Sequence, residues 1–203
     1  MENWLKSLSL EGDKVKLIPL EKTHKNGLVE AASDGKLWEL WFTTVPSEYT
    51  IDQYISQAIA QKEAKTALPF VIIEQSSNKI IGSTRFCNAE AAHRRLEIGY
   101  TWYAKSHQRT GINAECKYLL LQYAFETLNC IAVQFKTDWF NVNSRNAIAR
   151  LGAKQDGILR NDRLNADGTY RDTVVFSIIA QEWHGVKKSL EYRLKKYKGG
   201  IVS

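Results

Sequence analysis

The chain has 203 residues, a length typical of one domain with a substantial core. Its hydrophobic content of 44% and charged content of 25% are those of an ordinary globular protein. No apolar stretch approaches the ~20 residues of a membrane span, and the N-terminus lacks the apolar core of a signal peptide. We therefore expect a cytoplasmic protein with no membrane partner.

The formal net charge is +6, and much of the excess comes from the end of the chain. After Gly185, only Glu191 opposes a run of basic residues: Lys187, Lys188, Arg193, Lys195, Lys196 and Lys198. Such a run is typical of the solvated face of an amphipathic helix, which we expect over about 185–198. Net charge alone also allows nucleic-acid binding, but no nucleic-acid motif accompanies it, so nucleic acid is not the expected partner.

The three cysteines, Cys87, Cys116 and Cys130, are odd in number and scattered. None of them forms a Cys-x-x-Cys pair, which indicates reduced thiols rather than a disulfide framework or a structural zinc site. The four histidines are also scattered. We therefore expect no metal.

The first half of the chain is predicted to form a strand, three helices and two more strands. The expected elements are a strand over 15–19, helices over 23–34, 37–42 and from 51 onward, and strands over 68–74 and 80–87. Thr50 and Gln53 have the spacing of a capping box that starts the third helix. That helix repeats apolar residues at the spacing of one buried face: Ile51, Tyr54, Ile55, Ala58 and Ile59.

Alternating residues mark the next strand, Arg94–Tyr103. The alternation predicts one face made of Leu96, Ile98, Tyr100 and Trp102, and an opposite face made of Arg95, Glu97, Gly99 and Thr101. A long helix is predicted after Gly111. Its apolar stripe is Ala114, Tyr118, Leu121, Phe125 and Leu128, with Glu115 off the stripe.

The second half continues with a strand over 130–139 and a helix that Ser144 caps and Gly152 ends. A hairpin follows, with strands over 154–163 and 170–179 joined by a turn at 165–168, and the basic helix closes the chain. This order of elements predicts an α/β (α+β) fold in which helices pack on a mixed sheet.

The segment Ser106–Glu115 links a predicted strand to a strongly patterned helix. Backbone N–H groups at such a helix start have no internal acceptor and lie beside the positive end of the helix dipole, which favours an anion, most naturally a phosphate. Gly111 has no Cβ and lets a ligand approach the backbone, and Arg109 adds a cation beside the loop. An ordinary loop leading into a core helix is the alternative.

The pattern Gln108-x-x-Gly111-x-Asn113 resembles the phosphate loop of the GNAT superfamily of acyl-CoA-dependent N-acetyltransferases, in which a small residue stands at the position of Asn113. Further matches lie downstream: Asn141-x-x-Ser144-x-x-Ala147-x-x-x-Leu151-Gly152-Ala153, Gly157-x-Leu159-Arg160, Gly168-x-x-Arg171-Asp172 and Glu182-Trp183. Together these motifs resemble the branch that includes the ribosomal-protein N-terminal (alanine) acetyltransferases. The resemblance covers about residues 12–185 of an expected single domain, 1–203.

This resemblance implies a mixed, mostly antiparallel sheet of about seven strands with helices on both faces. A V-shaped opening would separate the fourth and fifth strands, which end near Tyr103 and Trp139. Acetyl-CoA would lie in this opening as the co-substrate, without a metal. The residues implied in its binding are Gln108, Arg109, Thr110, Gly111, Ile112, Asn113 and Asn141; for Asn141 a plain turn role is the alternative.

In such an enzyme the acceptor amine attacks the thioester directly. Glu97 is the candidate to take the amine proton through water, although it could instead be an exposed strand carboxylate or a partner of Arg94 or Arg95. Many relatives place a tyrosine acid where this chain has Ile148. Ser144 is then the remaining hydroxyl for the CoA sulfur, with helix capping as its alternative role.

Three aromatic residues, Trp38, Trp41 and Phe42, fall in the region that borders the acceptor channel in the family, although aromatic residues are also common in cores. The expected function is acetyl transfer to a primary amine, on a protein N-terminus or a small molecule. The main alternative is a CoA-binding module without turnover, because the tyrosine acid is missing. The sequence leaves open the identity of the acceptor and whether the chain forms a dimer.

Overall fold

The structure is a computed structural model that describes residues 4–165 and 167–198. The strands are β1 (Leu10–Glu11), β2 (Val15–Pro19), β3 (Leu68–Glu74), β4 (Lys79–Glu90), β5 (Arg95–Tyr103), β6 (Ala132–Asp138), β7 (Lys154–Leu164) and β8 (Tyr170–Ile179). The α-helices are α1 (Lys25–Ser33), α2 (Ile51–Glu63), α3 (Ile112–Gln122), α4 (Val142–Ala149) and α5 (Trp183–Lys198). A π-helical turn, Tyr123–Thr127, extends α3. Within the described part of the chain, no helix is both long and apolar enough to cross a membrane.

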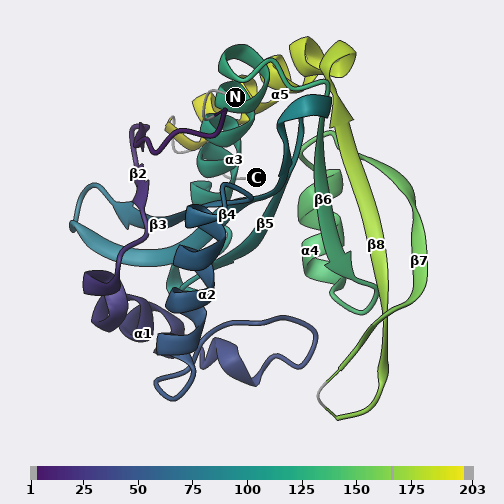
Figure 1. Cartoon of the computed structure of the whole chain (residues 1–203). Helices are drawn as coiled ribbons and strands as arrows, with labels where there is room; N and C mark the ends of the chain where they lie inside the picture. The colour runs from purple at the N-terminus through teal and green to yellow at the C-terminus, as the bar shows by residue number, and fades with distance from the viewer. Residues whose placement is uncertain (1–3, 166, 199–203) are drawn as a thin grey trace.

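One eight-stranded sheet runs in the order β1-β2-β3-β4-β5-β6-β8-β7 (Figure 1). The β5–β6 pair is parallel and all other neighbouring strands in it are antiparallel. The predicted mixed, mostly antiparallel sheet is therefore confirmed. The eighth strand is β1, which has only two residues and was not predicted, so the predicted fourth and fifth strands are β5 and β6.

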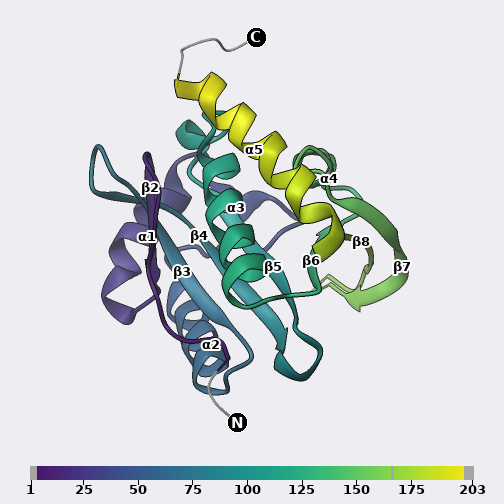
Figure 2. The same cartoon turned by 90° about the horizontal axis from the view of Figure 1, so that it is seen from above.

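Two apolar clusters cover the two faces of the sheet. The larger contains buried residues of α3, α4 and α5, among them Leu120, Ile148 and Leu190. The smaller contains buried residues of α1 and α2, among them Leu28 and Ile55. Seen from above, α5 runs alongside α3 (Figure 2). The sheet is thus a middle layer with helices on both faces, as predicted.

The predicted common face of Leu96, Ile98, Tyr100 and Trp102 on β5 is wrong from Tyr100 onward. This residue has a left-handed backbone with φ of 51°, and the register between β4 and β5 shifts around it. Such a β-bulge inserts one residue and reverses the alternation beyond it. Leu96 and Ile98 therefore face the larger cluster, whereas Trp102 packs in the smaller one and Tyr100 is exposed.

Two other helix predictions are wrong in detail, one in its capping and one in its length. Thr50 precedes α2, but its side chain makes no capping bond to the helix; its Oγ1 instead accepts a hydrogen bond from the N–H of Ser47 at 2.9 Å. The predicted helix over 37–42 is only a 3₁₀ turn, Leu37–Glu39.

The closing hairpin is confirmed, whereas α4 ends earlier than predicted, at Ala149 with Arg150 as its C-cap. Gly152 lies two residues beyond this cap and has a left-handed φ of 99°. In the turn between β7 and β8, Gly168 also has a positive φ, and its N–H donates to the carbonyl of Asn165 at 3.0 Å. Ala166, within the predicted turn 165–168, lies outside the described residues.

Candidate active site

The parallel strands β5 and β6 separate soon after they begin. Only three residue pairs join them, the last being Glu97 with Gln134. Beyond this pair β5 continues to Tyr103 beside β4, and β6 continues to Asp138 beside β8 (Figure 1). The facing edges of the two strands therefore carry backbone groups with no strand partner, and an extended amide ligand could pair with them. We call this opening the fork.

The loop that follows β5 is tied to the end of that strand. The side chain of Gln108 donates from Nε2 to the carbonyl of Tyr103 at 3.0 Å, and the Tyr103 hydroxyl donates to Oδ1 of Asn113 at 3.1 Å. Thr110 closes the loop by donating from Oγ1 to the carbonyl of His107 at 2.7 Å. The side chains of Gln108 and Asn113 thus hold the loop at the mouth of the fork.

Gly111 is the N-cap of α3 and has a φ of 92°; the exposed Arg109 is also left-handed, with a φ of 65°. The N–H groups of the first helical turn, from Ile112 onward, have no acceptor within the helix and lie at the positive end of its dipole. The predicted residues 108–113 therefore span the end of the loop and the first turn of α3, a helix start of the kind that favours an anion.

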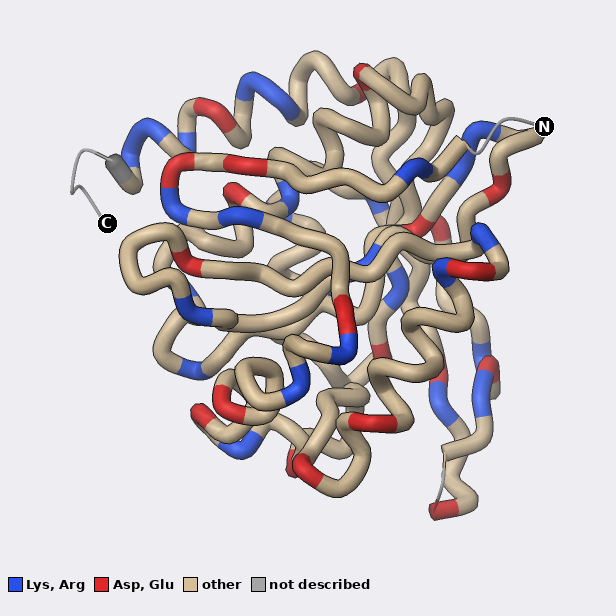
Figure 3. Tube along the Cα trace, turned by 60° about the vertical axis from the view of Figure 1, so that its left-hand side comes forward, with Lys and Arg blue, Asp and Glu red and all other residues tan. Residues whose placement is uncertain are grey.

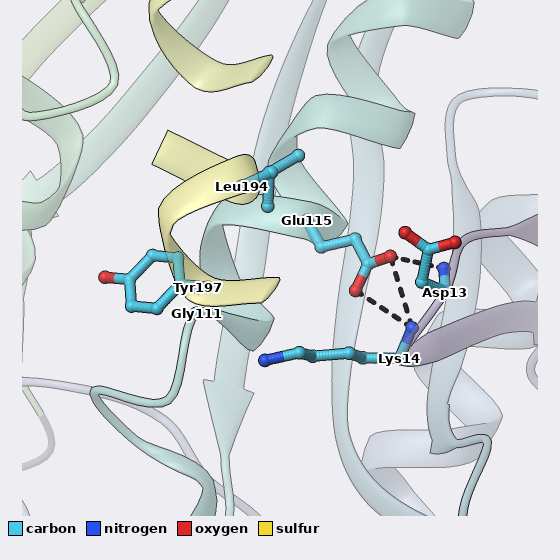
Figure 4. Close-up of a pocket in the computed structure, with 6 residues that line it drawn as sticks. All are labelled: Asp13, Lys14, Gly111, Glu115, Leu194 and Tyr197. Carbon is cyan, nitrogen blue, oxygen red and sulfur yellow. Dashed lines mark hydrogen bonds between the residues drawn. The ribbon is translucent and has the colours of Figure 1, made fainter. Parts of the chain in front are cut away.

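The C-terminal helix covers one side of this loop. The ring of Tyr197 lies against Gly111, so closely that a Cβ added to Gly111 would be 2.8 Å from the ring (Figure 4). The side chain of Lys14 reaches the same place, with its Nζ 5.8 Å from the Tyr197 ring centroid. Gly111 is thus required both by its positive φ and by the close approach of α5.

Glu115 lies beside this contact and is buried rather than on a solvated face, contrary to its position off the predicted stripe. Its carboxylate accepts hydrogen bonds from the N–H groups of Asp13 and Lys14 (Figure 4). It therefore joins α3 to the turn before β2. No sequence pattern indicated this role, because the partners lie about a hundred residues away.

The basic residues of α5 lie on a helix whose other face is packed (Figure 3). Trp183, Val186 and Leu190 are buried in the larger cluster. Lys187 pairs with Glu126 at 2.7 Å, and Arg193 donates to the carbonyl of Arg150 at 2.6 Å. These contacts agree with the predicted amphipathic helix.

Glu97 lies at the base of the fork and is 8% exposed. Its Oε2 accepts a hydrogen bond from Nδ2 of Asn88 at 2.9 Å and lies 3.4 Å from Nζ of Lys136. The alternative of an exposed strand carboxylate is therefore wrong, and the ion pair is with Lys136 on β6 rather than with Arg94 or Arg95. Glu97 is a buried carboxylate at the point where the strands part.

Lys117 of α3 is a buried lysine that the sequence patterns did not predict. It is 5% exposed, and its Nζ donates to Oγ1 of Thr101 on β5 at 2.7 Å. Burial lowers the pKa of its ammonium to about 8. The available signal was its position three residues after Ala114, on the buried side of the helix.

The β6 side of the fork is formed by the start of α4. Asn141, not Ser144, is the N-cap: its Oδ1 accepts a hydrogen bond from the N–H of Ser144 at 3.0 Å. The predicted capping by Ser144 is thus wrong, because the helix starts three residues earlier than expected. Ser144 is half-buried in the first turn, and Ile148, one turn later, is buried in the larger cluster.

The predicted acceptor-channel residues differ in exposure. Trp38 packs against the smaller cluster and Phe42 is half-buried, whereas Trp41 is 66% exposed. The Trp41 ring lies 5.4 Å from the ring of Phe140, in the segment that follows β6, and 5.5 Å from that of Phe42. Aromatic side chains from two distant segments thus meet, and Phe140 was not predicted.

The thiols of Cys87, Cys116 and Cys130 are free and buried. Burial raises the pKa of each of them, to about 12 for Cys116 and Cys130. Among the described residues, no three or more His, Cys, Asp and Glu side chains are grouped so that they could hold a metal ion.

Comparisons with known proteins agree with this geometry. The family model described as an acetyltransferase (GNAT) domain matches residues 14–154. YdaF of Bacillus subtilis (strain 168), named as a candidate ribosomal N-acetyltransferase, is 35% identical over 109 residues. That match spans 53% of this chain and only 58% of the length of YdaF.

Solved structures extend the similarity over most of the fold. The crystal structure of a candidate acetyltransferase from T. thermophilus is 33% identical, covers 94% of this chain and 99% of its own, and has a TM-score of 0.82. Mycobacterium smegmatis RimJ, solved in complex with CoA-disulfide, is 22% identical with a TM-score of 0.73 over 88% of each chain, and so shares the fold. The chain belongs to the GNAT acetyltransferase family.

Proposed function

We propose that this protein is an N-acetyltransferase that moves the acetyl group of acetyl-CoA to a primary amine. One observation carries the proposal: the fork between β5 and β6 opens beside a helix N-terminus whose N-cap is the left-handed Gly111. An open strand edge suits the amides of pantetheine, and the N–H groups of the helix start suit a pyrophosphate. CoA carries both groups on one molecule.

The residues of the site fit such a ligand. The backbone of residues 109–113 would hold the pyrophosphate, with Gln108 and Asn113 shaping the loop and Arg109 adding charge. Asn141 would hydrogen-bond the pantetheine from the other side of the fork. Acetyl-CoA supplies the acetyl group as a thioester, and the CoA thiolate is the leaving group.

Two residues are proposed for proton chemistry. Glu97, buried at the base of the fork, would accept the proton of the attacking amine through water. Ser144, in the first turn of α4, would donate a hydrogen bond to the CoA sulfur. It would do so in place of the tyrosine that many relatives have at the position of Ile148. The exposed Trp41 and the neighbouring Phe140 would form one wall of the acceptor channel.

A protein N-terminus is the acceptor that we favour. The name of YdaF points to ribosomal N-acetylation, and the motif from Asn141 to Ala153 resembles the ribosomal-protein branch. Small-molecule amines are the second candidate for the acceptor, because the proposed acceptor channel beside the exposed Trp41 would also admit them.

Ligand binding is the first test. CoA at ~100 times its Kd adds about 2.7 kcal/mol of stability, which raises the Tm of a domain of this size by roughly 5–10 °C. Arg109→Ala should reduce this shift, whereas Lys188→Ala, which removes the same charge from the exposed face of α5, should preserve it. An unchanged Tm at millimolar CoA would contradict the proposal.

Turnover is the second test. Thiol release from acetyl-CoA should depend on an added amine, and peptides with a free N-terminus should be compared with the same peptides blocked by acetylation and with small amines. CoA binding without thiol release from any acceptor would favour the CoA-binding module.

A further inference from the structure

We propose that the Lys117 ammonium stabilises the negative charge that acyl transfer places on the sulfur of CoA. This inference rests on the proposed function, because it requires CoA in the fork. It assigns a charged donor to α3, the helix opposite Ser144.

The position of Lys117 supports this role. Its Nζ donates to Oγ1 of Thr101 at 2.7 Å, and Thr101 also shares a hydrogen bond with Oγ1 of Thr84 at 2.8 Å. Thr101 directly follows the bulge residue Tyr100 and lies beyond Glu97, where β5 has already left β6. The ammonium therefore lies along the open part of β5, where a pantetheine arm paired with that strand would run.

The charge of Lys117 is not balanced by a carboxylate among the described residues. The groups that act on its pKa, after burial, are the thiols of Cys116 on α3 and Cys87 on β4. Both thiols have raised pKa values and stay neutral near pH 7. Around Cys87 lie Glu97, Arg85 and Lys136, and Glu97 is itself paired with Lys136.

A buried cation without an anion is unfavourable unless a ligand completes the site. The proposed reaction generates such an anion. The amine nitrogen forms a bond to the acetyl carbon, the carbon–sulfur bond breaks, and its electron pair leaves with sulfur. The amine loses its proton to water or Glu97, while Lys117 keeps its own proton and holds the thiolate. A preformed charged donor in a water-poor site stabilises such a charge strongly.

The test measures the bound thiol rather than turnover. Wild-type protein and Lys117→Met are saturated with CoA, and the thiolate is titrated by its ultraviolet absorbance, with desulfo-CoA complexes as blanks. An ammonium within a few ångströms lowers a thiol pKa by about one unit or more. We expect that lowering in the wild type and its loss in Lys117→Met.

Two further variants make the result decisive. Cys116→Ala alters the neighbouring buried residue of α3 and should keep the lowered thiol pKa. Lys117→Gln keeps a polar side chain without charge and should behave like Lys117→Met; it also replaces that variant if Lys117→Met does not fold. Equal thiol pKa values in the wild type and the uncharged variants would overturn the role of Lys117.

Turnover gives a second readout, and CoA binding separates the two proposals. The uncharged variants should bind CoA with a similar Kd and lose about 10²-fold in kcat, as when one charge-stabilising donor is removed. If wild-type protein binds no CoA, the proposed function fails and this inference with it. If it binds CoA but the bound thiol titrates as in the uncharged variants, only the role of Lys117 fails.

Discussion

The two sides of the fork differ in what they can contribute to acyl transfer. On the side of β5 and α3, Glu97 and Lys117 are both buried and ionisable. On the side of β6 and α4, Asn141, Ser144 and Ile148 are neutral, and the ionisable Lys136 and Asp138 are paired with Glu97 and Arg171. From this comparison we predict that the unpaired charge of the β5–α3 side acts on the reacting groups, and that the β6–α4 side supplies shape and neutral hydrogen bonds.

The bulge at Tyr100 helps to explain the difference. Up to Gly99 the alternation of β5 points Glu97 away from the larger cluster, and beyond the bulge Trp102 turns to that same side. Thr101 then meets Lys117 from α3. One inserted residue thus allows the strand to present a carboxylate to one face and a hydrogen-bond partner for a buried lysine to the other.

The largest expected effect is on the pH dependence of stability in Lys117→Met. The pKa of this lysine is about 8 in the folded chain, below its ordinary value of 10.5, so the fold disfavours the charged form. Its unfavourable burial is complete below pH 8 and disappears as pH rises toward 10.5. The stability advantage of Lys117→Met over wild type should therefore shrink by about 3 kcal/mol between pH 7 and pH 10.5, as measured by urea unfolding.

Lys187 offers a control of opposite sign. A hydrogen bond to Glu126 raises the pKa of Lys187, so this lysine contributes stability that is present at neutral pH and lost as pH rises through its folded value. The Lys187→Met variant should thus lose stability relative to wild type at pH 7 and recover toward it above the folded pKa. If both variants respond alike to pH, the buried charge at Lys117 is not the cause.

The next effect concerns Glu97. If it draws the amine proton through water, Glu97→Gln should lower kcat by about 10²-fold with CoA affinity nearly unchanged. The pH–rate profile should also lose its acidic limb, since no carboxylate remains to be protonated. Steady-state kinetics across pH, corrected for the folded fraction, measure both changes.

Glu90→Gln removes an exposed carboxylate from the end of β4 and is the matched control. It should keep wild-type kinetics at every pH. If Glu97→Gln also keeps wild-type kinetics, the buried carboxylate serves only to bind Asn88 and Lys136. The amine would then lose its proton directly to water.

Only part of this asymmetry could be predicted from the sequence, which indicated Glu97 but not Lys117. The predicted phosphate loop depends on a helix start and a glycine, which are local features, and the structure does place Gly111 at the start of α3. Alternation located Glu97 correctly, because it lies before the bulge. The same alternation is wrong from Tyr100 onward, because a bulge depends on pairing with β4 and leaves the local sequence pattern unchanged.

Contacts between distant segments explain the remaining differences. The helical pattern places Glu115 off the buried stripe, but backbone N–H groups from the turn before β2 satisfy its carboxylate. Lysine is rarely buried, so the residue type of Lys117 argues against its buried position. A hydrogen bond from its ammonium to Thr101 of β5 helps to accommodate it there. Phe140 reaches Trp41 across about a hundred residues of sequence. Periodicity describes one element at a time and cannot report such partners.

The smallest effects are expected on the β6–α4 side, where capping and turnover should separate. Asn141→Ala removes the N-cap acceptor and should destabilise the fold by about 1 kcal/mol. Ser144→Ala leaves the backbone N–H of residue 144 bonded to Asn141, so its stability should change little. If the Ser144 hydroxyl serves the sulfur, kcat should fall by about three- to tenfold, the value of one neutral hydrogen bond.

Both variants are followed by melting curves and by thiol release, so that one pair of measurements tests the two roles. Ser144→Cys, with a weaker donor, should give an intermediate kcat. A Ser144→Ala variant with the kcat of the wild type would leave the sulfur to the β5–α3 side alone. The comparison between the two sides would then become sharper, because the α4 helix start would contribute only its cap and its binding surface. A loss of about 1 kcal/mol in Ser144→Ala instead of Asn141→Ala would contradict the helix start seen in the structure.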